Sequence, residues 1–202
     1  VHAFIQNAKK TLIYSYFFPP LKNTENTRYV YPILRDKIYQ LKPTDGDYIL
    51  VYQTSTSNNE LIELLKKNPQ QNFIVYGFHV DKKEDNVLFR SFSEDLLYKD
   101  FKDAKCVITN GGFSFITEAL QLGKPILSIP VKKQFEQILN AIYLDKLGYG
   151  EHHSKINQAI LDNFIEKIPV YKKNISEKYV KPKNNNETLN ILKETIEEVI
   201  NN

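Results

Sequence analysis

The chain of 202 residues is 42% hydrophobic and 25% charged, proportions that are typical of a globular domain and exclude a disordered or fibrous chain. Its net charge of +3 is too small to indicate nucleic acid as a partner. A single cysteine, Cys106, excludes an intrachain disulfide and a zinc site made of several cysteines, and it favours a reducing, cytoplasmic location. The chain begins at Val1 and contains no methionine, so we expect a piece of a longer protein.

The first 42 residues contain one strand pattern and one helix pattern. Residues 11–18 are β-branched and aromatic, which predicts a strand. Residues 23–27 are polar and predict a loop. Apolar side chains recur at helical spacing in residues 31–41, where Pro32 suits the first turn of a helix.

Residues 43–168 alternate between strand and helix patterns. Continuous apolar runs are typical of strands buried on both faces of a parallel sheet, and the segments between them have helical spacing. The expected strands are 48–52, 72–76, 87–90, 104–109 and 125–129. The expected helices are 58–67, 93–97, one from the glycines at 111–112 to about 122, 134–147 and 155–167, with Ser57, Ser93 and Ser154 as N-caps. This alternation predicts an α/β domain with a doubly wound parallel sheet.

Residues 169–202 have a different character. Five lysines and one glutamate lie in residues 171–183, which predicts a solvated basic loop. The alternative is a contact of these lysines with a membrane face or with a phosphate-bearing substrate. A helix is expected over residues 187–200.

The most informative ligand-binding pattern is the segment 109–112 (TNGG). Ligands of open parallel sheets bind beyond the carboxyl ends of the strands, and here a predicted strand runs into two glycines and then into a helix. Glycine lets a ligand approach the backbone closely, and the N-terminus of a helix favours a phosphate. A tight turn without any ligand explains the glycines equally well.

Two sets of polar residues follow this segment. Ser114 and Glu118 form an i, i+4 pair, and a carboxylate one turn into the helix can accept hydrogen bonds from vicinal hydroxyls such as those of ribose. Gln134, Glu136 and Gln137 open a later helix and suit sugar hydroxyls. The alternatives are an exposed helix glutamate and an ordinary amphipathic helix with solvated glutamines.

The remaining candidate groups favour no catalytic or metal site. His152 and His153 are adjacent, so their rings cannot share one helical face, and we expect a solvated pair. Cys106 lies inside a predicted strand and is expected to be a buried apolar residue. No carboxylate cluster or metal-spaced set of histidines is evident in the sequence.

Residues 109–150 contain, in order, the glycine pair, a glutamate, GKP, QFEQ and NA. This run resembles the nucleotide-sugar-binding signature of GT-B glycosyltransferases, the superfamily of the UDP-glycosyltransferases and of the lipid-linked N-acetylglucosaminyltransferase of peptidoglycan synthesis. It resembles in particular a group of prokaryotic glycosyltransferase-like proteins. That group also has stretches similar to residues 31–38, 49–55, 73–78 and 86–94.

The resemblance implies one Rossmann-like half of a GT-B fold and assigns roles to particular positions. It places the donor diphosphate at Asn110, Gly111, Gly112, Phe113 and Ser114. It places the ribose at Glu118, the donor sugar at Gln134, Glu136 and Gln137, and the base beside Phe92. Two departures leave the donor sugar open, because related enzymes often have histidine at position 110 and aspartate at position 136.

The resemblance also implies the activity and the partners. It implies an inverting transfer of a hexose or N-acetylhexosamine from a UDP-sugar, without a metal or cofactor. The catalytic base is expected in an N-terminal GT-B domain or partner chain. Residues 1–42 would end that domain, residues 43–168 would bind the nucleotide sugar, and the helix 187–200 would pack back toward the domain. A cytoplasmic location follows, peripheral to the membrane if the acceptor is membrane-associated.

Two other functions remain open at this point. One is a non-catalytic nucleotide-sugar-binding subunit that needs a partner chain. The other is an isomerase similar to UDP-N-acetylglucosamine epimerase, which shares the GT-B fold but needs acid and base side chains beside the sugar.

Overall fold

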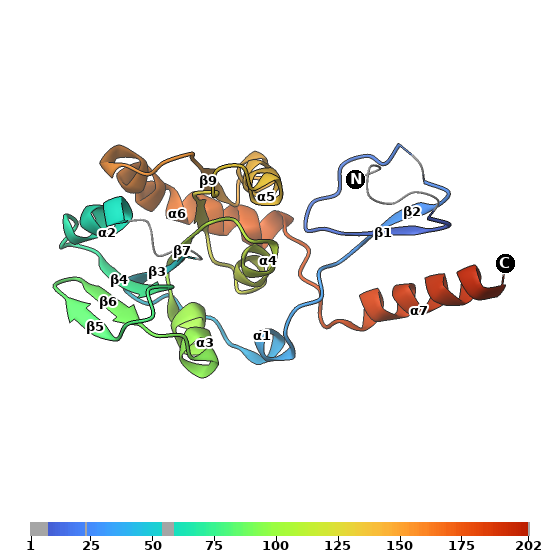
Figure 1. Cartoon of the computed structure of the whole chain (residues 1–202), viewed down its shortest axis with the longest axis horizontal. Coiled ribbons are helices and arrows are strands. Elements are labelled where there is room, and N and C mark those ends of the chain that lie inside the picture. The colour runs from blue at the N-terminus through green and yellow to red at the C-terminus, as the bar shows by residue number, and fades with distance from the viewer. Residues whose placement is uncertain (1–7, 23, 54–58, 202) are drawn as a thin grey trace. The chain divides into compact units, whose positions relative to one another are not determined.

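The computed structural model describes residues 8–22, 24–53 and 59–201. The chain divides into two compact units (Figure 1). The larger, here called the sheet unit, is Gln40–Lys181. The smaller, here called the terminal unit, combines Val1–Tyr39 with Pro182–Asn202.

The sheet unit is built on a seven-stranded sheet with the strand order β5-β6-β4-β3-β7-β8-β9. All neighbouring strands are parallel except β5, which is antiparallel to β6. The strands are β3 (Tyr48–Tyr52), β4 (Asn72–Tyr76), β5 (Lys82–Glu84), β6 (Val87–Arg90), β7 (Cys106–Thr109), β8 (Ile126–Ser128) and β9 (Gly150–His152). Without β5, this is the 3-2-1-4-5-6 order of a Rossmann fold. The predicted fold class is therefore confirmed.

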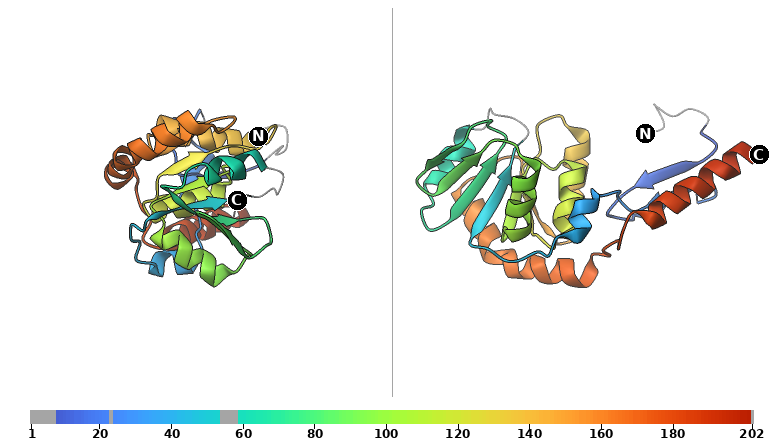
Figure 2. Two further views of the ribbon diagram at one scale, coloured as in Figure 1. Left: turned by 90° about the vertical axis from the view of Figure 1, so that its left-hand side faces the viewer. Right: turned by 90° about the horizontal axis from the view of Figure 1, so that it is seen from below.

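Helices cover both faces of this sheet (Figure 2). Alternate residues of the strands, such as Ile49 and Val51, share a buried core with α2 (Asn59–Lys66) and α6 (Gln158–Lys178). Tyr52 stacks on Phe115 of α4 (Phe113–Gln121), with 4.6 Å between the ring centroids. The remaining helices are α3 (Glu94–Asp103) and α5 (Phe135–Lys146). Burial on both faces explains why the strands read as continuous apolar runs.

Two strands of the sheet were not expected from the sequence. β5 consists of charged residues and forms a hairpin with β6. β9 pairs with β8 and contains Gly150, where a Cβ atom would lie 1.8 Å from the carbonyl oxygen of Ile126. Only glycine allows that close approach, so β9 depends on contact with its neighbour and not on strand propensity.

The prediction for α6 was wrong at both ends. The helix begins after Asn157, whose side chain accepts a hydrogen bond from the Ile160 amide at 2.9 Å, and Ser154 is not the cap. It then continues through Pro169 to Lys178, so the first part of the expected basic loop is helical. Proline removes one helical hydrogen bond, but Tyr171 and Ile175 beyond it are buried and hold the helix on the sheet.

The other differences concern helix ends. α3 extends to Asp103, well past the turn expected at 93–97, and the Ser93 side chain makes no capping hydrogen bond. Ser57, the expected cap of α2, lies outside the described residues, as does the start expected for that helix at residue 58.

The terminal unit contains the parallel strands β1 (Thr11–Tyr14) and β2 (Thr27–Val30) and the helix α7 (Asn186–Asn201). β2 begins where a loop was expected. The helix expected at 31–41 is reduced to α1 (Asp36–Gln40), whose last residue belongs to the sheet unit. Pro32 favours extended backbone in the residue before it, and the backbone of Leu34 is bonded to a side chain instead of to a helical turn. The amide and carbonyl of Leu34 both bond to the Asn185 side chain, at 3.0 and 2.8 Å, which fastens this segment to the start of α7.

Candidate functional site

The carboxyl ends of the parallel strands lie in register along one edge of the sheet. A single row of paired residues runs across it: Arg90, Tyr76, Tyr52, Thr109, Ser128 and His152. The strand order reverses between β3 and β7, and ligands of such sheets bind in the crevice at that reversal. The glycine-containing segment that follows Thr109 therefore lies at the expected ligand position.

Asn110 joins the ends of three strands at this point. It is buried, and its Nδ2 donates to Gln53 Oε1 at 3.1 Å and to the Ile129 carbonyl at 3.1 Å. Gln53 follows β3 and Ile129 follows β8, so the side chain of Asn110 fixes the shape of the loop. The amide at position 110 thus has a structural role in this loop.

The two glycines have different roles. Gly111 has a φ of +88°, and a Cβ atom there would lie 2.8 Å from Ser128 Oγ and 3.0 Å from the Gln137 carbonyl. Gly112 has an ordinary φ of −61°, and no atom of the described chain comes within 4 Å of its would-be Cβ. The tight turn therefore requires Gly111 but not Gly112, whose side of the loop is open.

The N-terminus of α4 has the character of an anion site. Gly112 is its N-cap residue and has no side chain to bond the first amides, and the first turn contains no acidic residue. Within α4 itself, therefore, no acidic side chain of the first turn neutralises the positive end of the helix dipole. Phe113 is half-buried and Ser114 is exposed in this first turn.

Glu118 lies one turn deeper and is only 3% exposed. This excludes the interpretation of an exposed helix glutamate. A carboxylate is costly to bury unless polar groups contact it. Glu118 thus lies about one turn along α4 from the turn at Gly112, and its role as the residue that binds the ribose stays a prediction.

The three residues expected at the donor sugar lie at the start of α5 and differ in their exposure and contacts. Gln134 and Glu136 are exposed. Gln137 instead uses Oε1 to accept a hydrogen bond from the Val131 amide at 3.0 Å, and its carbonyl lies against Gly111. Asn140 adds a bond of 3.3 Å from Nδ2 to the Gly111 carbonyl. Gln137 and Asn140 therefore hold α5 against the loop.

Phe92 lies at the same edge but is separated from this group. It is 58% exposed in the loop after β6, and three strand spacings, about 14 Å, separate β6 from β7. The structure thus places the start of α5 against the loop at Gly111, with Glu118 one turn into α4, and it leaves Phe92 farther along the edge.

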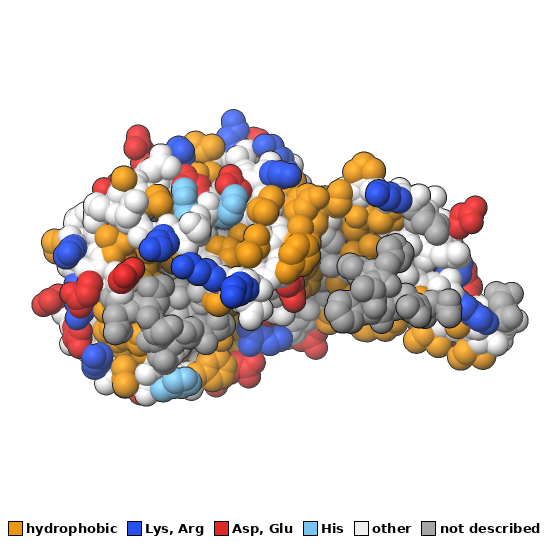
Figure 3. All heavy atoms as spheres, turned by 45° about the horizontal axis from the view of Figure 1, so that its top comes forward, with side chains coloured by type: hydrophobic (Ala, Val, Ile, Leu, Met, Phe, Trp, Pro, Cys, Tyr) orange, Lys and Arg blue, Asp and Glu red, His pale blue; other side chains and the backbone are white. Residues whose placement is uncertain are grey.

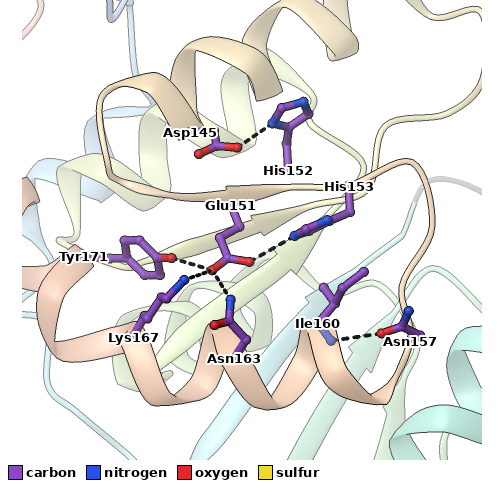
Figure 4. Close-up of polar contacts among 9 residues, drawn as sticks. All are labelled: Asp145, Glu151, His152, His153, Asn157, Ile160, Asn163, Lys167 and Tyr171. Atoms are coloured by element: carbon purple, nitrogen blue, oxygen red, sulfur yellow. Dashed lines mark hydrogen bonds and ion pairs between the residues drawn. The ribbon is translucent and has the colours of Figure 1, made fainter.

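A polar cluster beyond β8 was missed in the sequence (Figure 4). Glu151 accepts hydrogen bonds from Tyr171 Oη at 2.6 Å and Asn163 Nδ2 at 2.7 Å, and it contacts His153 Nε2 at 3.0 Å. His152 Nδ1 lies 2.8 Å from Asp145 Oδ2. Burial would raise the pKa of Glu151, but the bonds from Tyr171 and His153 outweigh it and lower that pKa.

The expectation of a merely solvated histidine pair is therefore wrong, because each ring contacts a carboxylate. Figure 3 shows two histidines near each other on one face, with acidic side chains beside them. Asn163 and Tyr171 lie 12 and 20 residues from Glu151 in the sequence, so local spacing did not indicate the whole cluster. The cluster fastens β9 to α6.

Three further observations bear on the chemistry. Cys106 is buried in β7, and burial raises the pKa of its thiol to about 12, which confirms it as a packing residue. Among residues 8–22, 24–53 and 59–201, no three histidine, cysteine or acidic side chains are grouped to hold a metal ion. Of the helices in the described part of the chain, none combines the length and apolar character that crossing a membrane requires.

The comparisons with known proteins agree with this geometry. The chain belongs to glycosyl transferase family 1, whose family model matches residues 1–169. An uncharacterized glycosyltransferase of Methanosarcina mazei is 34% identical over 109 residues, which cover 51% of this chain and 28% of that protein. One from Methanosarcina acetivorans is 45% identical over 65 residues, which cover 32% and 17%.

Solved structures show the same fold. CalG4, the calicheamicin glycosyltransferase, matches with a TM-score of 0.59 and 17% identity over 84% of this chain and 47% of that one. Phytolacca americana UGT2, complexed with UDP-2fluoro-glucose and pterostilbene, matches with a TM-score of 0.56 and 17% identity over 77% and 42%. The predicted likeness to GT-B glycosyltransferases is confirmed. The chain spans less than half of these structures and about a quarter of the M. mazei relative.

Proposed function

We propose that this chain is the donor-binding half of an inverting glycosyltransferase that moves a hexose or N-acetylhexosamine from a UDP-sugar to an acceptor. The observation that carries the proposal is the N-terminus of α4, which follows Gly112 at the reversal of strand order and has no acidic residue in its first turn, with Glu118 buried one turn behind it. Membership of the glycosyl transferase family and the UDP-2fluoro-glucose held by the P. americana neighbour support it.

The chemistry assigns the chain a definite share of the reaction. Breaking the bond between sugar and diphosphate leaves negative charge on the departing diphosphate. The amides of the Gly112–Phe113 turn and the dipole of α4 stabilise that charge without rearranging. Glu118 accepts hydrogen bonds from the ribose hydroxyls, and Gln134 and Glu136 contact the sugar. The base that activates the acceptor comes from an N-terminal domain or a partner chain.

The first test is a thermodynamic cycle at Glu118. UDP and 2′-deoxy-UDP are titrated calorimetrically into the chain and into Glu118→Gln, which keeps the side-chain volume. A hydrogen bond to a charged group contributes about 1.5–3 kcal/mol, so we expect UDP to bind the variant at least about tenfold more weakly. Deoxy-UDP lacks one hydroxyl, so the substitution should weaken its binding by a smaller factor.

Glu136→Gln is the matched control for the nucleotide step, because this exposed residue is proposed to contact only the sugar. This substitution should leave the affinity for UDP unchanged and weaken the binding of UDP-N-acetylglucosamine or UDP-glucose. Equal losses for UDP and deoxy-UDP in Glu118→Gln would reject the ribose role. Absence of any UDP binding to the unsubstituted chain would count against a self-sufficient donor site and favour a subunit that needs its partner.

A second experiment separates transfer from isomerisation. The protein that contains the upstream residues is incubated with UDP-N-acetylglucosamine, and its products are analysed. Free UDP together with a glycosylated acceptor supports the proposal, whereas a UDP-sugar epimer formed without an acceptor supports the isomerase.

A further inference from the structure

The amino end of the sheet, opposite the donor loop, has a cavity of about 240 Å³ within the sheet unit. It lies between the loop 43–45 before β3, the turn 122–124 between α4 and β8, and the last turns of α6, and we call it the lysine pocket. One water molecule occupies roughly 30 Å³ of liquid, so the space exceeds that of a single water several times. It is smaller than most pockets for drug-sized ligands, which suits a small solute.

Three lysines from three separate segments line the lysine pocket. They are Lys124 in the turn before β8, Lys172 in α6, and Lys181 beyond the end of α6. Asp45 is the one acidic residue among the lining residues. Its Oδ1 lies 2.6 Å from Lys172 Nζ and 4.0 Å from Lys124 Nζ, so one carboxylate forms ion pairs with two ammonium groups.

The third lysine adds charge that this carboxylate does not balance. Lys181 Nζ lies near Gly123, 3.6 Å from where a Cβ atom of that glycine would be. No ion pair of Lys181 is found among the described residues. The next carboxylate, Asp103, is already paired with Lys102 at 2.5 Å. Three lysines against Asp45 leave the pocket lining with a charge of +2.

Lys124 gives the pocket a buried polar group. It is only 1% exposed, and its ammonium donates to the Thr44 carbonyl. Burial, and more weakly the neighbouring Lys172, lower the pKa of Lys124 to about 8, although Asp45 and Asp103 act in the opposite direction. The ammonium is therefore incompletely compensated by the charges around it, and an anion in the pocket would complete that compensation.

We propose that the lysine pocket binds a phosphate dianion, either free or as a small phosphate monoester, at a site separate from the donor loop. A phosphate offers three or four oxygens to donors that converge from different directions, and lysine is a suitable point-charge partner for them. A dianion also matches the charge excess of +2. This assigns a ligand to part of the lysine-rich segment 171–183, which donor binding leaves unexplained.

The test is a titration followed by the backbone amide resonances of the ¹⁵N-labelled chain in a phosphate-free buffer. Inorganic phosphate and glycerol 3-phosphate are added in separate series to about 10 mM. We expect saturable shifts at Gly123 and Lys124, with the amides of Gly111 and Gly112 reporting separately on the donor loop. Tighter binding of glycerol 3-phosphate would identify an esterified phosphate as the ligand, and equal binding would identify the phosphate group alone.

Two substitutions should act in opposite directions on this binding. Lys172→Gln removes a donor and should weaken binding about tenfold, whereas Asp45→Asn removes the competing carboxylate and should strengthen it. Lys173→Gln is the matched control, because this neighbour on α6 is exposed and lies 4.0 Å from Glu177. The proposal is overturned if phosphate shifts only Gly111 and Gly112, if no saturable shift occurs, or if Lys172→Gln and Lys173→Gln bind alike. UDP titrated in parallel should leave the Gly123 resonance unshifted. A failure of phosphate to bind the lysine pocket can therefore be distinguished from a failure of UDP to bind the donor loop.

Discussion

Substitution of the two loop glycines by alanine should have sharply different effects on stability. Gly111→Ala forces a side chain into a backbone with φ of +88°, which costs about 1–3 kcal/mol. Its new methyl group would also lie 2.8 Å from Ser128 Oγ and 3.0 Å from the Gln137 carbonyl, and such overpacking costs about 1–3 kcal/mol more. The sum, about 2–6 kcal/mol, is a large part of the stability of a domain.

Gly112→Ala is the matched control. Its φ of −61° and ψ of 132° suit any residue, and the space beside it is open among the described atoms, so stability should change by less than about 0.5 kcal/mol. Urea unfolding followed by circular dichroism measures both variants against the unsubstituted chain. If a donor phosphate lies against this loop, Gly112→Ala should still weaken UDP binding.

The reasoning is refuted if Gly111→Ala is as stable as the unsubstituted chain, or if the two variants lose equal stability. In either case the loop would adopt a different backbone from the one described, and the donor site built on it would have to be revised.

The remaining predictions concern Lys124 and α6. The folded pKa of Lys124, about 8, is below the ordinary 10.5, so the unfolded chain binds more protons between those values and stability rises with pH. From about pH 7.5 to about pH 9.5 the free energy of unfolding should rise by about 2 kcal/mol more in the unsubstituted chain than in Lys124→Met. Urea unfolding in a phosphate-free buffer measures this difference. If the free energies of the two proteins change with pH in parallel, the prediction is contradicted. Asn157→Ala should cost about 1 kcal/mol because it removes the N-cap of α6, whereas Ser154→Ala should be neutral; equal losses in thermal or urea unfolding would show that Asn157 is not the cap.

The sequence predicted those parts of the fold that local patterns determine. The buried parallel strands are continuous apolar runs, and the turn from β7 into α4 has its glycine pair. β9 and the later part of α6 could not be predicted in this way. β9 exists because Gly150 lets the backbone pair closely with Ile126, and α6 passes Pro169 because buried residues beyond it anchor the helix.

The same distinction applies to the candidate site. The sequence pattern indicated which residues follow the glycine pair, but not how they are held. The bond from Asn110 to Gln53 joins residues 57 positions apart, and the bond from Asn140 reaches Gly111 from a different helix. Burial of Glu118 likewise depends on how α4 packs on the sheet. Contacts between distant segments leave no trace in local spacing, so only the structure could show them.

The two edge strands of the sheet have a consequence for the behaviour of the protein at high concentration. An exposed edge strand can pair with the edge of another molecule and so begin aggregation. Here β5 presents Lys82, Lys83 and Glu84, and β9 at the other edge is only three residues long. Strands that are charged or very short are poor templates for such pairing. The seven-stranded sheet should therefore resist edge-to-edge pairing between copies of this chain.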